Sequence, residues 1–170
     1  MQNIVSGNVR VTTVYSIGLH ELPAYLKRFL KEFPKVNVHV DYRRSNEVYD
    51  EILNGISDLG LVAFPVQKKG IRIEPFKKDR LVVICSPQHP LASKEKVKID
   101  DLVTHKFIGF EPDIPTRKEI DQILHERSLE VKPVMEFDNI ETVKRAVEID
   151  AGISTRPPCN GAARSYPRKS

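Results

Sequence analysis

Two polar segments in the first third of the chain could bind a small acid. One surrounds Ser16 within residues 15–20, and the other is the run 43–46, which holds two arginines, a serine and an asparagine. Hydroxyls and free backbone N–H groups at the beginning of a helix favour an anion. An arginine can hold a carboxylate or a phosphate through two parallel hydrogen bonds. The segments therefore predict an anion site, although either could be an ordinary turn with a capping serine and solvated arginines.

Two further segments could complete such a site. Thr116 and Arg117 follow Pro115 at the expected beginning of a helix. Thr116 could close on an anion there, or it could merely cap the helix while Arg117 points to solvent. Phe64 and Pro65 end an apolar run, where the ring could pack on a ligand or belong to the core.

No pattern in the chain indicates catalysis or metal binding. The five histidines are scattered without metal-ligand spacing, and there is no glycine-rich phosphate loop. Cys85 falls in an apolar strand pattern with no adjacent base, and a buried thiol is usually inert. We therefore predict no catalytic residue, no metal site and no cofactor.

The elements that must position these residues alternate between strands and helices. β-Branched residues predict a strand over residues 9–14, and apolar residues at three- and four-residue steps predict a helix over residues 22–33. Alternation predicts a second strand over residues 36–42, Ser45 is expected to cap a helix, and residues 59–64 are typical of a buried parallel strand. This order would bring the polar turns to one edge of an open sheet, where such sheets bind small molecules.

The pattern changes after the third strand. Two strands are predicted over residues 71–76 and 81–86, around a polar hinge at residues 77–80. We place the boundary at this hinge, so that residues 1–76 form a first lobe and residues 77–153 form a second. The second lobe continues with a short helix near residues 100–103, a strand over 107–110, a helix over 115–128, a strand over 132–137 and a helix over 140–149.

The end of the second lobe and the residues after it differ in character. Asp138 with Glu141 three residues later resembles a capping box for the last helix, and Gly152 is placed to end that helix. Residues 154–170 have no apolar periodicity and no acidic residue, so they are predicted to form an irregular tail. The four basic residues of this tail equal the whole formal net charge of +4. Residues 1–153 are therefore balanced and have no net excess of positive charge for a nucleic-acid surface.

Length and composition are typical of a domain from a reducing compartment. The chain has 170 residues and is 40% hydrophobic, enough for one large domain or two small lobes. It has no apolar run long enough to cross a bilayer, and its first residues do not resemble a secretory signal. The two cysteines form no disulfide framework. We expect a cytoplasmic protein that does not bind a membrane.

The order and spacing of these features resemble the effector-binding domain of LysR-type transcriptional regulators. No single motif is specific, but the matches extend over residues 7–153. They include Gly7-Asn8-Val9-Arg10-Val11, Leu22-Pro23, Asn54-Gly55, Asp58-Leu59-Gly60, His89-Pro90-Leu91-Ala92, Thr116-Arg117 and Ala151-Gly152-Ile153.

The resemblance implies an α/β fold with two lobes, like that of type 2 periplasmic binding proteins, in which each lobe is a mixed sheet flanked by helices. It also implies an effector cleft between the lobes, no enzymatic activity, and a homodimer that pairs through helices at residues 22–33 and 118–128. DNA would be bound only through a winged helix-turn-helix that this sequence does not contain. The sequence also departs from the family after Ile153.

We expect the effector to be a small anionic metabolite. Ser16 and Ile17 are carried over from the family, and the other contacts come from the segments above. The ten expected contacts are Ser16, Ile17, Arg43, Arg44, Ser45, Asn46, Phe64, Pro65, Thr116 and Arg117. A solute-binding protein of a transporter with the same two-lobed fold is the alternative, and an enzyme on this fold is a more distant one.

Overall fold

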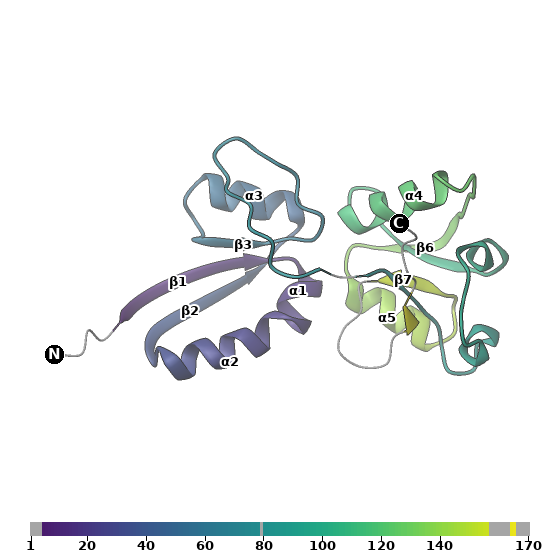
Figure 1. Cartoon of the computed structure of the whole chain (residues 1–170), viewed down its shortest axis with the longest axis horizontal. Helices are drawn as coiled ribbons and strands as arrows, with labels where there is room; N and C mark the ends of the chain where they lie inside the picture. Colours follow the sequence, from purple (N-terminus) through teal and green to yellow (C-terminus); the bar gives the residue numbers. More distant parts are fainter. Residues whose placement is uncertain (1–4, 79, 157–163, 166–170) are drawn as a thin grey trace. The chain divides into compact units, whose positions relative to one another are not determined.

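The computed structural model describes residues 5–78, 80–156 and 164–165. The chain divides into two compact units, Met1–Glu74 and Pro75–Ser170. Each unit has its own strands with helices packed on them (Figure 1). The sequence placed a lobe boundary two residues later, after residue 76.

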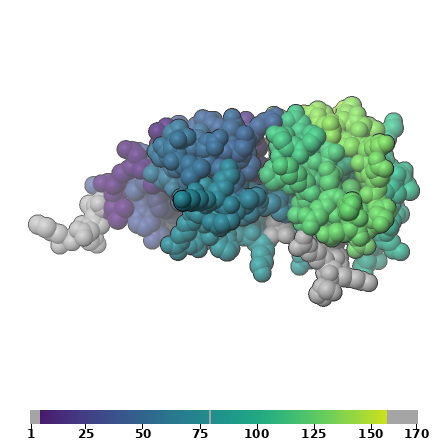
Figure 2. Space-filling model, turned by 90° about the horizontal axis from the view of Figure 1, so that it is seen from above, coloured from purple at the N-terminus to yellow at the C-terminus, as the bar shows by residue number. Residues whose placement is uncertain are grey.

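The first unit is a three-stranded parallel sheet with helices on both faces. Its elements are β1 (Ser6–Thr13), α1 (Tyr15–His20), α2 (Leu22–Glu32), β2 (Lys35–Tyr42), α3 (Ser45–Leu53) and β3 (Leu59–Leu61). The strand order is β2-β1-β3 and both pairings are parallel. Helices α2 and α3 lie on opposite faces of the sheet (Figure 1). In the space-filling view, α3 and the segment after β3 form one face of this unit (Figure 2).

Local sequence explains where these elements end and how closely they pack. Helix α2 ends before Phe33, whose N–H still bonds the helix, and Pro34 follows, a residue that cannot continue a helix. Gly60 allows α3 to lie close to β3. A Cβ at this position would lie only 2.8 Å from Val48 and 3.1 Å from Ile52 on α3.

The carboxyl ends of the three strands are aligned. Thr13 at the end of β1 is paired with Tyr42 at the end of β2 and with Leu61 at the end of β3. The alignment continues for one residue, because Arg43 N–H bonds Thr13 O at 3.0 Å and Val14 N–H bonds Leu61 O at 3.1 Å. We call this side of the sheet the carboxyl edge. With the order β2-β1-β3, the topological switch point lies between β1 and β3, and open α/β sheets bind ligands outside the strand ends at such a point.

Two expectations about the first unit were wrong in detail. Residues 15–20 form the short helix α1 rather than a turn. The strand expected over residues 59–64 ends at Leu61. It ends early because Phe64 adopts a left-handed backbone conformation, with φ of 49°, and Pro65 has no N–H to donate to a ladder.

Strand β3 is also more exposed than its sequence predicted. Leu59 is 57% exposed, so the strand is not covered on both faces. No strand within the described residues pairs with the outer side of β3, and residues 71–76, predicted to be a strand, form none. We expected a mixed sheet in each lobe, and the three strands described in this unit are all parallel.

The second unit contains a mixed arrangement of strands. Its elements are β4 (Val82–Ile84), the 3-10 helices η1 (Pro90–Ser93) and η2 (Ile99–Thr104), β5 (Phe107–Phe110), α4 (Pro115–His125), β6 (Pro133–Phe137), α5 (Ile140–Glu148), β7 (Ser154–Arg156) and β8 (Arg164–Ser165). Strands β5 and β6 are parallel, while β4 is antiparallel to both β7 and β8. A parallel bridge between Phe107 and Ile153 connects β5 to the residue before β7.

The main hydrophobic core lies in this second unit. Ile108, Val143 and Ile153 are fully buried in it, and Leu91 and Phe107 are each 2% exposed. The core takes residues from β5, α4, α5 and the 3-10 helices. These elements hold α4 and α5 firmly against the strands, because burial of a large apolar side chain contributes about 1.5–3 kcal/mol.

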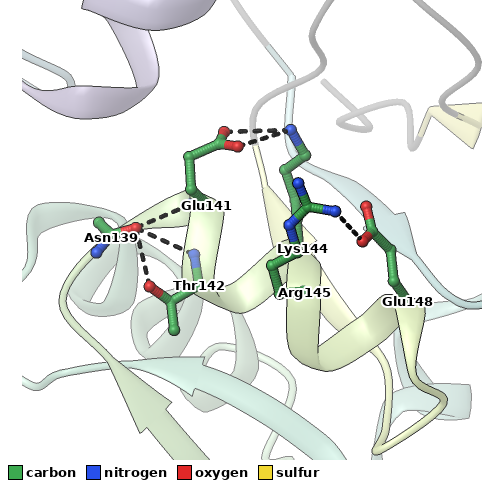
Figure 3. A network of polar contacts seen from close by, with 6 residues as sticks. All are labelled: Asn139, Glu141, Thr142, Lys144, Arg145 and Glu148. Carbon is green, nitrogen blue, oxygen red and sulfur yellow. Dashed lines mark hydrogen bonds and ion pairs between the residues drawn. The ribbon is translucent and has the colours of Figure 1, made fainter.

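Helix α5 begins at a cap that the sequence placed one residue too early. Asn139, not Asp138, is the N-cap. Its Oδ1 accepts hydrogen bonds from the N–H groups of Glu141 at 3.0 Å and Thr142 at 3.1 Å, and from the Thr142 hydroxyl at 3.2 Å (Figure 3). The helix also carries two ion pairs, Glu141 with Lys144 and Arg145 with Glu148 (Figure 3).

The helices of this unit end at residues other than those predicted. Helix α4 ends at His125, and Ser128, with φ of 55°, turns the chain after it. After α5 the left-handed residue is Asp150, with φ of 59°, rather than Gly152. Gly152 is needed for a close approach instead, since a Cβ there would lie 2.5 Å from Lys106 O.

The residues directly after Ile153 are not irregular. Ser154–Arg156 form β7, paired with β4, although the sequence predicted a tail from residue 154. Ser154 is fully buried, and its hydroxyl donates to Ile108 O at 2.6 Å. Sheet pairing therefore orders a segment that has no apolar periodicity. The rest of the predicted tail, apart from the two-residue strand β8, lies outside the described residues, as does Cys159.

Candidate functional site

Eight of the ten predicted contacts belong to the first unit, and all eight follow one of its three strands. Ser16 and Ile17 follow β1, the run 43–46 follows β2, and Phe64 with Pro65 follows β3. Because the ends of these strands are aligned, the parallel register brings these segments to the carboxyl edge. Thr116 and Arg117 follow β5 in the second unit, so their approach to the other eight stays a prediction.

Ser16 and Ile17 are half-buried residues of α1. The N–H of Ile17 bonds Val14 O at 3.2 Å, and Val14 gives the helix no side-chain cap. Gly18 brings α1 close to the sheet, since a Cβ there would lie 2.5 Å from Thr13. Ser16 is therefore held beside the end of β1, but α1 has only six residues and so provides a weak dipole.

Arg43 has protein partners that give it a structural role. Its Nε donates to Glu51 at 2.7 Å and its Nη1 donates to Tyr42 O at 2.9 Å. Glu51 also accepts a hydrogen bond from the Ser57 hydroxyl at 2.9 Å. Burial would raise the pKa of Glu51, but the hydrogen bonds from Ser57 and Arg43 lower this pKa below its ordinary value. Hydrogen bonding to Glu51 raises the pKa of Arg43. Arg43 thus fixes the turn after β2.

The beginning of α3 carries the residues best placed for an anion. Arg44, not Ser45 as predicted, occupies the N-cap position, and its N–H donates to the Glu47 carboxylate at 2.8 Å. Ser45 and Asn46 are the first two helical residues, half-buried and exposed respectively. N–H groups in the first turn of a helix have no partner within the helix and can donate to an anion. The Glu47 carboxylate already occupies part of this end.

Phe64 and Pro65 are both exposed after β3. Phe64 is 38% exposed and has a left-handed backbone, which is unusual for a bulky residue and is found at functional sites more often than elsewhere. The Val66 N–H donates to the Tyr49 hydroxyl at 2.8 Å, so the segment is tied to α3. The structure therefore favours an exposed position for Phe64 over a place in the core.

Thr116 and Arg117 lie in the first turn of α4 but in different surroundings. Thr116 is 8% exposed and does not cap the helix, because Ile114 is the N-cap. Arg117 donates to both oxygens of Asp121 at 2.9 Å, to Phe110 O at 2.8 Å and to Glu136. Burial would lower the pKa of Arg117, but its bonds to Glu136 and Asp121 raise it. Arg117 therefore ties α4 to β5 and β6 instead of pointing to solvent.

Sequence reasoning missed the residues that support the carboxyl edge. Glu51 holds Arg43, Tyr49 holds the segment after β3, and Tyr42 stacks against Tyr15. The sequence around these residues indicated only an amphipathic helix and an alternating strand, and it did not indicate their partners. Gly18 was the one visible signal, since a glycine in a helical segment often marks a close approach.

Within the described ranges, no cluster of three or more histidine, cysteine, aspartate or glutamate residues could hold a metal ion. Cys85 is half-buried. No helix in the described part of the chain is long and apolar enough to span a bilayer.

Comparisons with known proteins agree with this architecture. The family model described as LysR substrate binding domain matches residues 2–163. The HTH-type transcriptional activator CmpR of Synechocystis sp. (strain ATCC 27184 / PCC 6803 / Kazusa) is 29% identical over 154 residues, which cover 91% of this chain and 50% of that protein.

Two solved structures show the same fold. The Synechocystis PCC6803 CcmR regulatory domain in complex with 2-PG has a TM-score of 0.81 and 26% identity, covering 94% of this chain and 78% of that chain. The effector binding domain of QuiR in complex with shikimate has a TM-score of 0.82 and 22% identity, covering 92% of this chain and 76% of that chain.

The two α/β units, the first with its three strand ends aligned at one edge, define an effector-binding domain of the two-lobed periplasmic-binding-protein-like class. The chain belongs to the LysR substrate binding domain family, which confirms the resemblance found in its sequence. It spans about half the length of the curated relatives it matches. Those relatives are named as transcriptional regulators.

Proposed function

We propose that this chain is the effector-sensing part of a LysR-type transcriptional regulator and that its effector is a small acid. The alignment of the three strand ends at Thr13, Tyr42 and Leu61 is the observation that carries the proposal. It brings the hydroxyl and amide groups of the first unit to the carboxyl edge of a parallel sheet, the side on which open α/β sheets bind ligands. The family match supports the regulatory role.

The acid group would be bound at the beginning of α3. Ser45 and Asn46 supply first-turn N–H groups, a hydroxyl and an amide there. Arg43 would not bind the acid directly, because Glu51 holds its guanidinium; it would instead fix the turn that leads into α3. Arg44 follows it at the helix cap. Ser16, at the end of β1, would supply a further hydroxyl.

The second unit would contribute Thr116 from the first turn of α4. Its N-terminal position on an eleven-residue helix provides N–H groups and a favourable dipole for an anion. Arg117 would hold that helix in place through Asp121 and Glu136. The effector would shift the regulator only if one arrangement of the lobes binds it more tightly than another.

A direct binding experiment tests this site. Isothermal titration calorimetry with a panel of carboxylic and phosphorylated acids should find at least one ligand for the wild-type chain. Ser45→Ala and Thr116→Ala should each weaken its binding by about tenfold to a hundredfold, because a hydrogen bond to a charged group contributes about 1.5–3 kcal/mol. Ser93→Ala, which changes an exposed serine of η1, is the matched control and should leave affinity unchanged. Equal affinity in all four proteins would exclude the site.

The remaining properties of the regulator are part of the same proposal. A helix-turn-helix outside the matched span would bind DNA, in a cytoplasmic protein without enzymatic activity. Tyr25 and Leu30 are exposed apolar side chains of α2, 44% and 42% exposed, which supports a homodimer through that helix. Analytical ultracentrifugation that finds only monomer at high concentration would argue against this dimer. The regulator names of the relatives favour a sensor over the solute-binding protein of a transporter.

A further inference from the structure

An exposed aromatic pair lies at the carboxyl edge of the first unit. Tyr15 is the first residue of α1, separated from β1 by Val14 alone, and is 44% exposed. Its ring stacks on the ring of Tyr42, with 5.2 Å between the ring centroids and 30° between the planes. The Tyr42 hydroxyl donates to Gly18 O at 3.4 Å, and a Cβ on Gly18 would lie 2.6 Å from the ring. Tyr42 is therefore fixed by the fold, and Tyr15 rests on it while still exposed to solvent.

A second exposed ring follows the neighbouring strand. Phe64 is 38% exposed and is held in a left-handed conformation, with φ of 49°. The bond from Val66 N–H to the Tyr49 hydroxyl ties the segment to α3 just beyond Phe64. This conformation costs a bulky residue about 1–3 kcal/mol, which the surrounding structure must offset. Burial of the ring does not explain the conformation, because the ring is exposed.

Tyr15 follows β1 and Phe64 follows β3, the two strands that flank the switch point. Val14 N–H bonds Leu61 O at 3.1 Å, so the residue before Tyr15 lies directly beside the end of β3. Phe64 follows that strand end by three residues. An open-chain acid bound at the beginning of α3 would leave exposed aromatic surface in water. A flat ring could cover it and add the stacking attraction of aromatic pairs.

We propose that Tyr15, supported by Tyr42 and assisted by Phe64, makes the effector site prefer acids that carry a flat ring over open-chain acids. The acid group would lie at the beginning of α3 and the ring against Tyr15. This inference rests on the proposed function, since it assigns a ligand class to the same site. Tyr15 is then a specificity-determining residue, whereas the beginning of α3 serves any acid.

Matched ligands and matched variants test the inference on the whole chain. The ligands are benzoate, which has a flat ring, and phosphoglycolate, an open-chain acid, with affinities from calorimetry. Tyr15→Ala should weaken benzoate binding about tenfold, which corresponds to about 1.4 kcal/mol, and should change phosphoglycolate binding less than twofold. Tyr15→Phe keeps the ring and should retain benzoate affinity. Tyr25→Ala removes a tyrosine of equal exposure, 44%, from α2, and it should leave the affinities for both acids unchanged, whatever it does to the dimer.

A spectroscopic measurement gives an independent answer on the wild type. The chain has five tyrosines and no tryptophan, so ring-labelled tyrosine gives a simple NMR spectrum. Benzoate stacked on Tyr15 should shift its ring signals upfield, and Tyr15→Ala assigns those signals. If that variant does not fold, the signals can be assigned with Tyr15→Phe.

The possible results separate this inference from the proposed function. Benzoate binding that Tyr15→Ala leaves unchanged, or phosphoglycolate binding without any benzoate binding, would overturn the inference. In either outcome, weaker binding of benzoate or phosphoglycolate by Ser45→Ala would still support the acid site. If the wild type does not bind benzoate at millimolar concentration, the inference is overturned, whereas the acid site is overturned only if no acid of the wider panel binds.

Discussion

Replacing Asn139 by alanine should loosen α5 by a predictable amount. Asn139 Oδ1 accepts three hydrogen bonds at the first turn, two from N–H groups and one from the Thr142 hydroxyl (Figure 3). Loss of an asparagine N-cap costs about 0.5–2 kcal/mol. With three bonds lost at a half-buried position, we expect the upper half of that range, about 1–2 kcal/mol.

Native-state hydrogen exchange of the α5 amides measures this cost locally, so the two units need not unfold together. A loss of about 1–2 kcal/mol should speed exchange at Val143 and Val147 about fivefold to thirtyfold. Asn139→Asp keeps the acceptor and places a negative charge at the helix N-terminus. It also loses the bond that Asn139 Nδ2 donates to Asp138 at 2.7 Å and brings two carboxylates together. Its effect should therefore fall between wild type and alanine.

A matched control separates the cap from asparagine loss in general. Asn37→Ala removes an exposed asparagine of the first unit whose amide bonds Asn8 at 3.1 Å. It should change stability by less than about 0.5 kcal/mol and leave α5 exchange untouched. If Asn139→Ala exchanges no faster than wild type, or no faster than Asn139→Asp, the reasoning about this cap is refuted.

Three other changes test the packing and the charge of the two units. Since the folded pKa of Glu51 is lowered, its stabilising contribution is present above its unfolded pKa of about 4.3 and is lost as the pH falls through the folded value. The loss of stability of the first unit with falling pH, measured by hydrogen exchange of α3, should therefore be steeper in wild type than in Glu51→Gln. Parallel curves would contradict this. Ile140→Ala removes a 3%-exposed side chain and should lower the free energy of urea unfolding by about 2–5 kcal/mol. The control Ile149→Ala, at a 78%-exposed position, should change it by less than about 0.5 kcal/mol. Similar losses in the two variants would contradict the burial of Ile140. Gly60→Ala puts a methyl group 2.8 Å from the buried Val48 and should destabilise the first unit by about 1–3 kcal/mol in thermal unfolding, unless α3 moves away freely.

The sequence by itself determined the family, the alternation of strands and helices, and the edge at which eight of the ten predicted contacts lie. These features are local or repeat along the chain. Apolar periodicity predicted α2 and α3, and β-branched residues predicted β1, because each pattern depends on which side of one element is buried. Once parallel strands are expected, the turns after Thr13 and Tyr42 must share an edge.

Only the tertiary structure decided what the charged residues contact and where strands stop. Arg43 and Arg117 look alike in sequence to solvated or ligand-binding arginines, but Glu51 and Glu136 hold them, from positions 8 and 19 residues away. Ser154–Arg156 have no strand pattern, yet pairing with β4, about 70 residues earlier in the chain, makes them a strand. Such partners depend on contacts distant in sequence, which no local periodicity records.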